Sequence, residues 1–190
     1  MPRKILLTMT LALLPLVGCG VAPPPGSNAR LPSDATQGAG DPTRAAILGS
    51  AYAFGNNTGG PAALARAAAN MEFLAATLPY DPRYSFMGSE MMTLPAAQSE
   101  LRQTLLIASD ADPQLVIDGL YGVSRALRAE NPRAAADVLP PRAFPQAEVT
   151  VQRLAAMPPL PATAAAASAL EQGLRRQENE RLRGGIRGRF

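Results

Sequence analysis

The sequence predicts an all-α protein: a single compact, alanine-rich helical bundle of about six to seven helices behind a disordered N-terminal tether. Asp or Asn is repeatedly followed by Pro, a pairing typical of helix starts because the short side chain caps free backbone N–H groups and Pro fits the first helical position. Ala, Leu, Met, Gln and Arg, which favour helices, fill the stretches between these starts. Alternating strand-like runs are missing. The 190 residues suffice for one domain.

Seven helices follow in order from these signals. The clearest one contains Val116, Leu120, Val123 and Leu127, which form one apolar stripe at helical spacing. The second helix is rich in alanine with only a narrow polar strip, so we expect it to be buried on most sides. The predicted helices are 42–54, 61–78, 95–109, 113–129, 132–139, 145–156 and 161–183, in a helical domain over 41–183.

The N-terminus combines a basic start with a short apolar run. Arg3 and Lys4 precede the run at 5–17, whose 13 residues fall short of the about 20 that a membrane-spanning helix needs and are typical of a secretory signal peptide. The run ends in the tetrapeptide Leu16, Val17, Gly18 and Cys19. This tetrapeptide resembles the lipobox of bacterial lipoproteins, in which the Cys is acylated and becomes the mature N-terminus. The resemblance implies a signal peptide over 1–18 and a lipid anchor on Cys19.

The same resemblance implies a location in the bacterial cell envelope. Gly20 follows the Cys, whereas an Asp at this position favours retention of Gram-negative lipoproteins in the inner membrane. The resemblance therefore implies an outer-membrane lipoprotein that faces the periplasm. Residues 20–40 are rich in Pro, Gly and Ser, and we expect 19–40 to be the lipidated Cys and a flexible linker that spans about 25 Å on average.

Composition excludes several function classes. His and Trp are absent and Cys occurs once, which excludes zinc sites built from His and Cys, Ser-His-Asp or Cys-His catalysis, and an intramolecular disulfide. We therefore expect no metal and no cofactor. Residues 19–174 are mildly acidic, so we expect no nucleic-acid-binding face on the folded domain.

One stretch between predicted helices concentrates aromatic and methionine side chains. It contains three of the seven Met residues, and Met adapts to irregular partner surfaces. Two interpretations remain open at this point: a lip that binds a partner, or a loop folded onto the core. The candidate partner-binding residues are Tyr80, Tyr84, Phe86, Met87, Met91 and Met92.

The C-terminal segment is strongly basic. We expect the last helix to leave the core near Leu174, to continue in solvent with the help of a Glu171–Arg175 pair, and to end at Gly184, so that 184–190 form a flexible basic tail. The alternatives are an anionic-surface-binding segment and a solvated tail that binds nothing. The candidate residues are Arg175, Arg176, Arg181, Arg183, Arg187 and Arg189.

Two other loops allow a ligand-binding interpretation. The Gly-rich stretch at 56–61 precedes a helix and resembles an anion cradle, but it lacks the preceding strand and the Lys that a phosphate loop needs. Asp110, Asp112 and Asp118 suggest calcium ligands, but Gln114 and Leu115 break the alternation that an EF-hand loop requires. A helix–helix turn and a helix cap by Asp112 are the favoured interpretations.

These features favour a membrane-anchored envelope lipoprotein that serves as a structural or adaptor module and binds a protein partner. An alternative is a pilotin-like assembly factor, which would hold a peptide in a groove between helices. A third possibility is a hydrolase that uses only carboxylates, with Glu72, Glu90 and Glu100 as candidates, since glycosidase chemistry needs two carboxylates at a set separation in a cleft. The sequence offers little aromatic surface for sugar stacking, and we do not expect an enzyme.

Overall fold

All seven predicted helices are present in the computed structural model, which describes residues 28–36, 40–56 and 60–187. The described residues are helical and contain no strand, so the predicted all-α class is confirmed. The α-helices are α1 (Pro42–Asn56), α2 (Pro61–Thr77), α3 (Gly88–Met91), α4 (Leu94–Thr104), α5 (Pro113–Arg128), α6 (Pro132–Asp137), α7 (Ala147–Ala155) and α8 (Pro161–Arg187). Three short 3-10 helices accompany them: η1 (Ser33–Thr36), η2 (Leu78–Tyr80) and η3 (Pro82–Met87).

The Asp-Pro and Asn-Pro steps act as the helix starts that the sequence predicts. The Asp41 carboxylate accepts from the backbone N–H of Thr43 at 2.9 Å at the start of α1, and Asp112 accepts from that of Gln114 at 2.8 Å at the start of α5. Asn131 caps α6 in the same way. Each cap satisfies N–H groups that lack a partner inside the helix, which explains why these helices begin at the following Pro.

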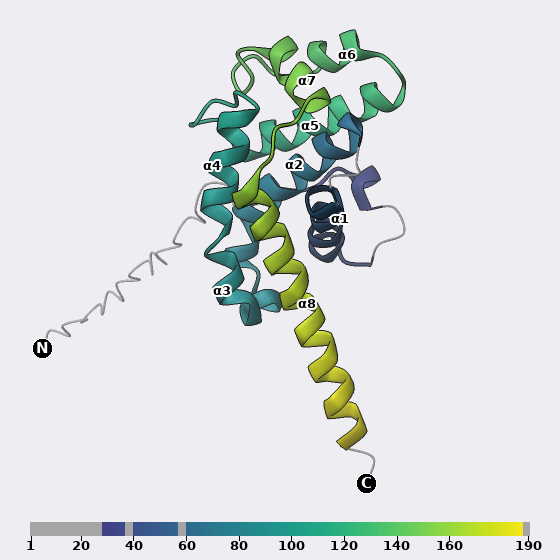
Figure 1. Ribbon diagram of the computed structural model, residues 1–190, viewed down its shortest axis with the longest axis vertical. Coiled ribbons are helices and arrows are strands. Elements are labelled where there is room, and N and C mark those ends of the chain that lie inside the picture. Colours follow the sequence, from purple (N-terminus) through teal and green to yellow (C-terminus); the bar gives the residue numbers. More distant parts are fainter. Residues whose placement is uncertain (1–27, 37–39, 57–59, 188–190) are drawn as a thin grey trace, which may run out of the picture.

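Helix α2 is the centre of the bundle. It packs mainly against α5 and α1 and also contacts α4 (Figure 1), and eleven of its residues, from Leu64 to Ala76, are buried. The expectation that this alanine-rich helix is buried on most sides is therefore confirmed. Its small side chains let neighbouring helices approach closely, while larger core side chains come both from α2, such as Met71 and Leu74, and from the helices around it, including Leu120 and Tyr121 of α5.

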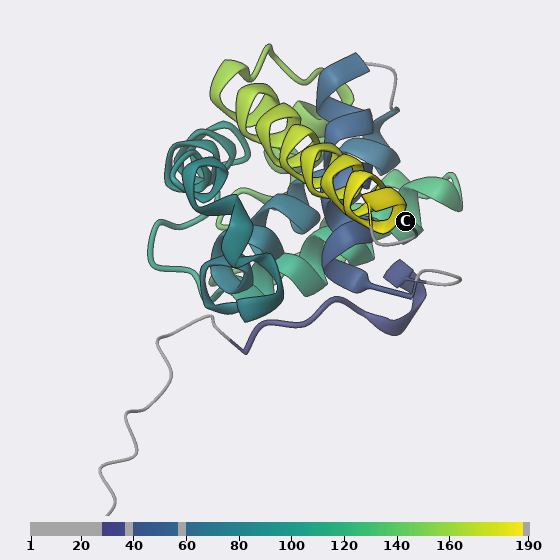
Figure 2. The same ribbon diagram turned by 90° about the horizontal axis from the view of Figure 1, so that it is seen from below.

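Residues 28–36 pack against the bundle, and we call them the strap. The backbone of Arg30 pairs twice with the Gln114 side chain, as a donor at 2.8 Å and as an acceptor at 3.1 Å. Asp34 accepts from Arg125 at 2.6 and 2.7 Å, and Ala35 is buried. The strap thus runs along the outside of α5 from its first turn toward its last (Figure 2, purple).

The prediction of a flexible linker over 19–40 is therefore wrong for the strap. Its Pro- and Gly-rich neighbourhood has no helical period, but side chains of α5 pair with the Arg30 backbone and with the Asp34 carboxylate and so hold the strap in place. Sequence periodicity does not detect contacts of this kind, since the partners lie about 90 residues away. Residues 19–27 and 37–39 lie outside the described residues.

We expect the strap to loosen when its ion pair is removed. Arg125→Ala should raise the rate of tryptic cleavage after Arg30 by up to about 5-fold, because an exposed pair contributes at most about 1 kcal/mol. The hydrogen bond from Arg125 lowers the pKa of Asp34 below 3.8. The contribution of the Asp34–Arg125 pair to the docking of the strap is therefore complete above pH 3.8 and is lost as the pH falls through the lowered pKa of Asp34. Arg133→Ala on α6 is the control, and equal cleavage of both variants would contradict a docked strap.

The last helix leaves the core where the sequence predicts but ends later. Leu174 is buried, residues 175–183 are exposed or half-exposed, and α8 extends past the rest of the bundle (Figure 1). The helix continues through Gly184 to Arg187, so the predicted end at Gly184 is wrong. Glycine weakens a helix by about 1 kcal/mol but does not forbid helical angles, and no Pro follows it. Residues 188–190 lie outside the described residues.

Two further boundaries differ from the prediction. Helix α4 ends at Thr104 and not at 109, because Leu106 takes a positive φ of 56° and the chain turns there. The segment between α2 and α4, predicted to have no helix, folds as η2, η3 and α3. In both places tertiary contacts decide the local conformation, and the good helix formers at 105–109 do not extend α4.

Candidate functional site

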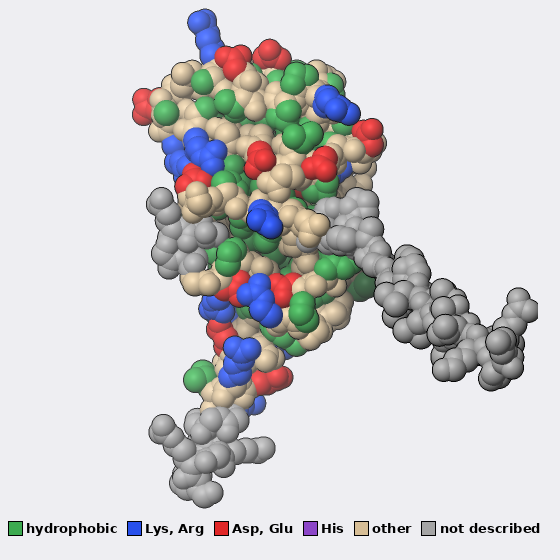
Figure 3. Space-filling view, turned by 180° about the vertical axis from the view of Figure 1, so that it is seen from behind, with side chains coloured by type: hydrophobic (Ala, Val, Ile, Leu, Met, Phe, Trp, Pro, Cys, Tyr) green, Lys and Arg blue, Asp and Glu red, His purple; other side chains and the backbone are tan. Residues whose placement is uncertain are grey.

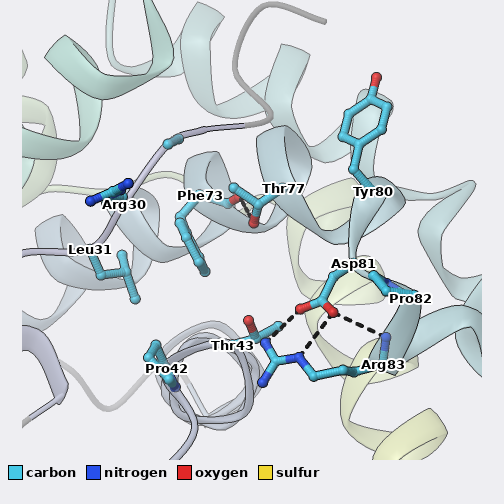
Figure 4. A pocket seen from close by; sticks show the side chains of 11 residues that line it. Arg30, Leu31, Pro42, Thr43, Phe73, Thr77, Tyr80, Asp81, Pro82 and Arg83 are labelled. Carbon is cyan, nitrogen blue, oxygen red and sulfur yellow. Dashed lines mark hydrogen bonds and ion pairs between the residues drawn. The ribbon is translucent and has the colours of Figure 1, made fainter. Parts of the chain in front are cut away.

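Two cavities differ in how their polar groups are used. The first, about 440 Å³, lies between the strap, the start of α1, the end of α2 and the residues after it. Asp81 and Arg83 line it but bond to each other at 2.6 and 3.0 Å (Figure 4), and the Thr77 hydroxyl donates to the carbonyl of Phe73. Because these groups satisfy one another, this cavity offers few free groups to a ligand.

The second cavity is a larger apolar groove of about 690 Å³ formed by α1, the first half of α2 and the end of α5. Leu48 and Tyr52, one turn apart on α1, form one wall and are 38% and 63% exposed. Leu127 of α5 forms the other wall. The floor is made by small residues, among them Ala63 and Ala67 of α2. We call this cavity the α1/α2/α5 groove.

Two buried polar side chains of α2 and α5 line the groove. Asn70 is held in place because its Oδ1 accepts from the Tyr121 hydroxyl at 2.6 Å. The Ser124 side chain is 1% exposed, and its hydroxyl has no hydrogen-bond partner within the described part of the chain. An unsatisfied buried hydroxyl costs stability, and Ser124 places such a group in the lining of the groove.

A glycine lets α1 and α2 approach beside the groove. A Cβ added at Gly49 would lie 3.2 Å from the Asn70 side-chain nitrogen, which is tight and would press on the residue that Tyr121 holds. Gly49 therefore permits both the close helix contact and the position of Asn70. The groove and its polar floor thus depend on small residues at exact positions.

The charged residues that line the groove, among those described, have one sign. Arg66 and Arg128 line it, and no acidic residue is among its described lining residues. Arg66 donates to the carbonyl of Ala35 at 3.2 Å, so the strap holds this guanidinium at the rim of the groove. Asp34 of the strap is paired with Arg125. The groove is therefore apolar with a positive edge, a combination that suits an apolar occupant carrying negative charge.

The six predicted partner-binding residues do not form one surface. Tyr84 and Met87 are buried in the core, where the Tyr84 hydroxyl donates to Asp41 at 2.8 Å, and burial followed by this hydrogen bond raises the tyrosine pKa. Met91 is half-buried against the core. Tyr80, Phe86 and Met92 are exposed. The core interpretation of this segment therefore holds for Tyr84 and Met87, because η3 folds back onto α8.

The three candidate carboxylates are each occupied by different partners. Glu72 pairs with Arg102 and accepts from Gln98 at 2.8 Å. Glu90 pairs with Arg176. Glu100 caps the start of α8, where it accepts from the Thr163 backbone N–H and hydroxyl, both at 2.7 Å. Each carboxylate therefore holds two segments of the fold together, and the geometry favours structural roles for them.

The arginines of the C-terminal segment divide into two groups. Arg175 pairs with Glu171 as the sequence predicts, and Arg176 pairs with Glu90. Arg181 and Arg183 are exposed. The side chains of Arg187 and Arg189 lie outside the described residues, as do the lipobox residues Leu16, Val17 and Gly18 and the lipidation residue Cys19.

The remaining ligand hypotheses gain no support. Asp112 acts as a helix cap, Asp118 accepts from Gln114, and the described residues contain no group of three His, Cys, Asp or Glu side chains that could hold a metal ion. Residues 57–59 of the Gly-rich stretch lie outside the described residues. Acidic and basic side chains are interspersed over the face in Figure 3, without an extended basic area on the bundle.

The chain matches no protein-family model, no curated protein and no solved structure. Among the described residues, none of the helices combines the length and apolar character that crossing a membrane requires. The site is therefore assigned from its own geometry, which makes the α1/α2/α5 groove the principal candidate. The sequence-based predictions do not include the groove, although Leu48 and Tyr52 form an apolar pair at i, i+4 that is a usable signal for it.

Proposed function

We propose that this protein is a lipid-anchored adaptor of the bacterial cell envelope that binds a partner protein in the α1/α2/α5 groove. The observation that carries the proposal is the groove itself: about 690 Å³, apolar walls with Leu48 and Tyr52 exposed at its edge, and arginines as its only charged lining residues among those described. Exposed apolar surface that is rimmed by polar groups is typical of interaction sites. A pilotin-like assembly factor is a special case of the same proposal, since it would use the same groove.

The anchor is proposed from the Leu16–Cys19 tetrapeptide and from the geometry of the strap. Because the Arg30 backbone pairs with Gln114, the chain from Cys19 to this contact is about 11 residues long and can reach at most about 40 Å. The domain would therefore be held closer to the bilayer than it would be by a flexible linker over 20–40. We propose the outer membrane, facing the periplasm, because Gly20 does not match the inner-membrane retention signal.

We expect Cys19→Ser to release the protein from the membrane. Two or more acyl chains anchor a protein stably, and the variant has none. Cell fractionation should find the wild type in the outer-membrane fraction and the variant outside it, and mass spectrometry should find lipid on Cys19. An unmodified Cys19 in the mature protein would contradict the proposal of an anchor.

We expect a photo-reactive amino acid at Leu48 to crosslink to a partner in cells. The same amino acid at Met92, which is 80% exposed and belongs to the earlier candidate surface, serves as the matched position. An adduct of the same mass that forms at position 48 and is lost when Ala63→Glu is added supports the groove. Adducts at position 92 alone would show that the partner binds the surface around Met92 and not the groove. Adducts at neither position would overturn the adaptor proposal.

A further inference from the structure

We propose that the occupant of the α1/α2/α5 groove is an amphipathic α-helix of the partner, with acidic residues at the edge that meets Arg66 and Arg128. This inference rests on the proposed function, because it names the kind of segment that the adaptor would hold. Four properties of the groove carry it: the backbone chemistry of its walls, its length, its charge and the unpartnered hydroxyl in its floor.

The walls favour a helix over an extended peptide. All three sides of the groove are α-helices, whose backbone N–H and C=O groups are used within the helices. An extended peptide would press its own polar backbone against side chains with no sheet edge to pair with, and burying such groups without partners is costly. A helix satisfies its backbone internally and presents only side chains to the groove.

The dimensions fit about two helical turns. The α2 part of the floor extends from Pro61 to Asn70, which corresponds to about 13 Å at a rise of 1.5 Å per residue. Small floor residues such as Ala63 and Ala67 allow the occupant's backbone to come close. Leu48 and Tyr52 on one side and Leu127 on the other would flank apolar side chains spaced at i, i+3 or i+4, and i+7.

The charge of the rim selects an acidic partner. Arg128 is exposed at the end of α5, and Arg66 is held by the strap carbonyl of Ala35. With no acid among the described lining residues, a basic helix would meet like charge, whereas Glu or Asp beside the apolar face would pair with the arginines. A guanidinium also matches a carboxylate in shape, since it can donate two parallel hydrogen bonds.

The Ser124 hydroxyl supplies an independent indication of a ligand. It is buried and, among the described residues, unpartnered, so its removal should not weaken the free protein. If a polar side chain of the occupant bonds to it, however, its removal should weaken the complex. Ser124→Ala therefore separates the two roles: we expect a melting temperature at or above that of the wild type and a few-fold weaker binding.

The test uses residues 20–190, which include every described residue, and a random library of 16-residue displayed peptides. Selection on the wild type with counter-selection on Ala63→Glu should enrich peptides that have helical apolar spacing, acidic flanks and no central Pro. Circular dichroism should show that the selected peptides become helical when bound. Arg128→Glu should weaken their binding at least 10-fold, while Arg133→Glu, a matched change outside the groove, should leave it unchanged.

Several outcomes would overturn the inference. Enrichment of Pro-rich or basic peptides would indicate that the groove binds a different kind of segment. If no peptide is enriched on the wild type relative to the Ala63→Glu variant, the helix proposal is contradicted. Sodium laurate, an anionic amphiphile without a peptide backbone, is tested as an alternative ligand. If it saturates the groove while no peptide binds, the site holds a lipid-like anion. Crosslinks at Leu48 together with non-helical selected peptides would refute this inference and leave the adaptor proposal standing.

Discussion

Glu72→Ala should lower the free energy of unfolding by about 3–5 kcal/mol, the largest effect that we expect from a single substitution. Glu72 and Arg102 form an ion pair whose side chains are only 4% and 12% exposed. Removal of the carboxylate leaves the guanidinium buried without a counter-charge. The cost arises from that uncompensated charge and not from the strength of the pair itself.

Arg102 gives this pair a second structural role. Its guanidinium also donates to the carbonyls of Ser109 at 2.8 Å and Ala111 at 3.1 Å, in the loop that joins α4 to α5. The pair therefore joins α2, α4 and the start of α5. A Glu72→Leu, Arg102→Met double variant should lose less stability than the sum of the two single variants, because it buries no unpaired charge.

Urea denaturation of residues 20–190 provides the measurement, with the free energy extrapolated to zero denaturant. The control is Glu171→Ala, which removes the exposed pair with Arg175, whose side chain is 70% exposed. That change should leave the free energy of unfolding nearly unchanged, because solvent screens an exposed pair. Equal costs for Glu72→Ala and Glu171→Ala would show that the buried pair does not hold the bundle together.

Leu120→Ala should destabilise the protein by about 2–5 kcal/mol. Leu120 is 1% exposed and lies on the apolar stripe of α5, the helix that packs most extensively on α2. The substitution removes apolar contacts and leaves a cavity that the surrounding helices fill only in part. Leu115→Ala on the same helix is the control, since Leu115 is 40% exposed, and it should cost about 1 kcal/mol or less. Similar costs at both positions would place the stripe outside the core.

The helix starts and the core stripe show what local sequence can predict. Asp41, Asp112 and Asn131 each precede a Pro, and each caps a helix as expected, because capping depends on residues only two or three positions apart. The stripe at Val116, Leu120 and Val123 is buried as expected, because the helical period brings these residues to one face.

The strap and the methionine-rich segment show what local sequence does not decide. The strap has no period of its own and docks through Gln114 and Arg125, far away in the chain. For the methionine-rich segment, composition left open a partner-binding lip and a loop folded onto the core, and the fold buries Tyr84 and Met87 of η3 in the core. In both cases the decisive contacts are non-local, so composition and periodicity carry no signal for them.

The candidate site also combines features that local sequence predicts with features that arise from the packing of the helices. Local sequence accounts for the helices that surround the groove, for the small residues of α2 and for the positions of the arginines along these helices, because helix formation and capping follow from neighbouring residues. The packing of the helices is what brings α1, α2 and α5 together around a groove, leaves Ser124 without a partner among the described residues and lets the strap hold Arg66 at the rim. These properties belong to the packing of segments 20 to 90 residues apart, whose approach depends on how side-chain volumes fit together.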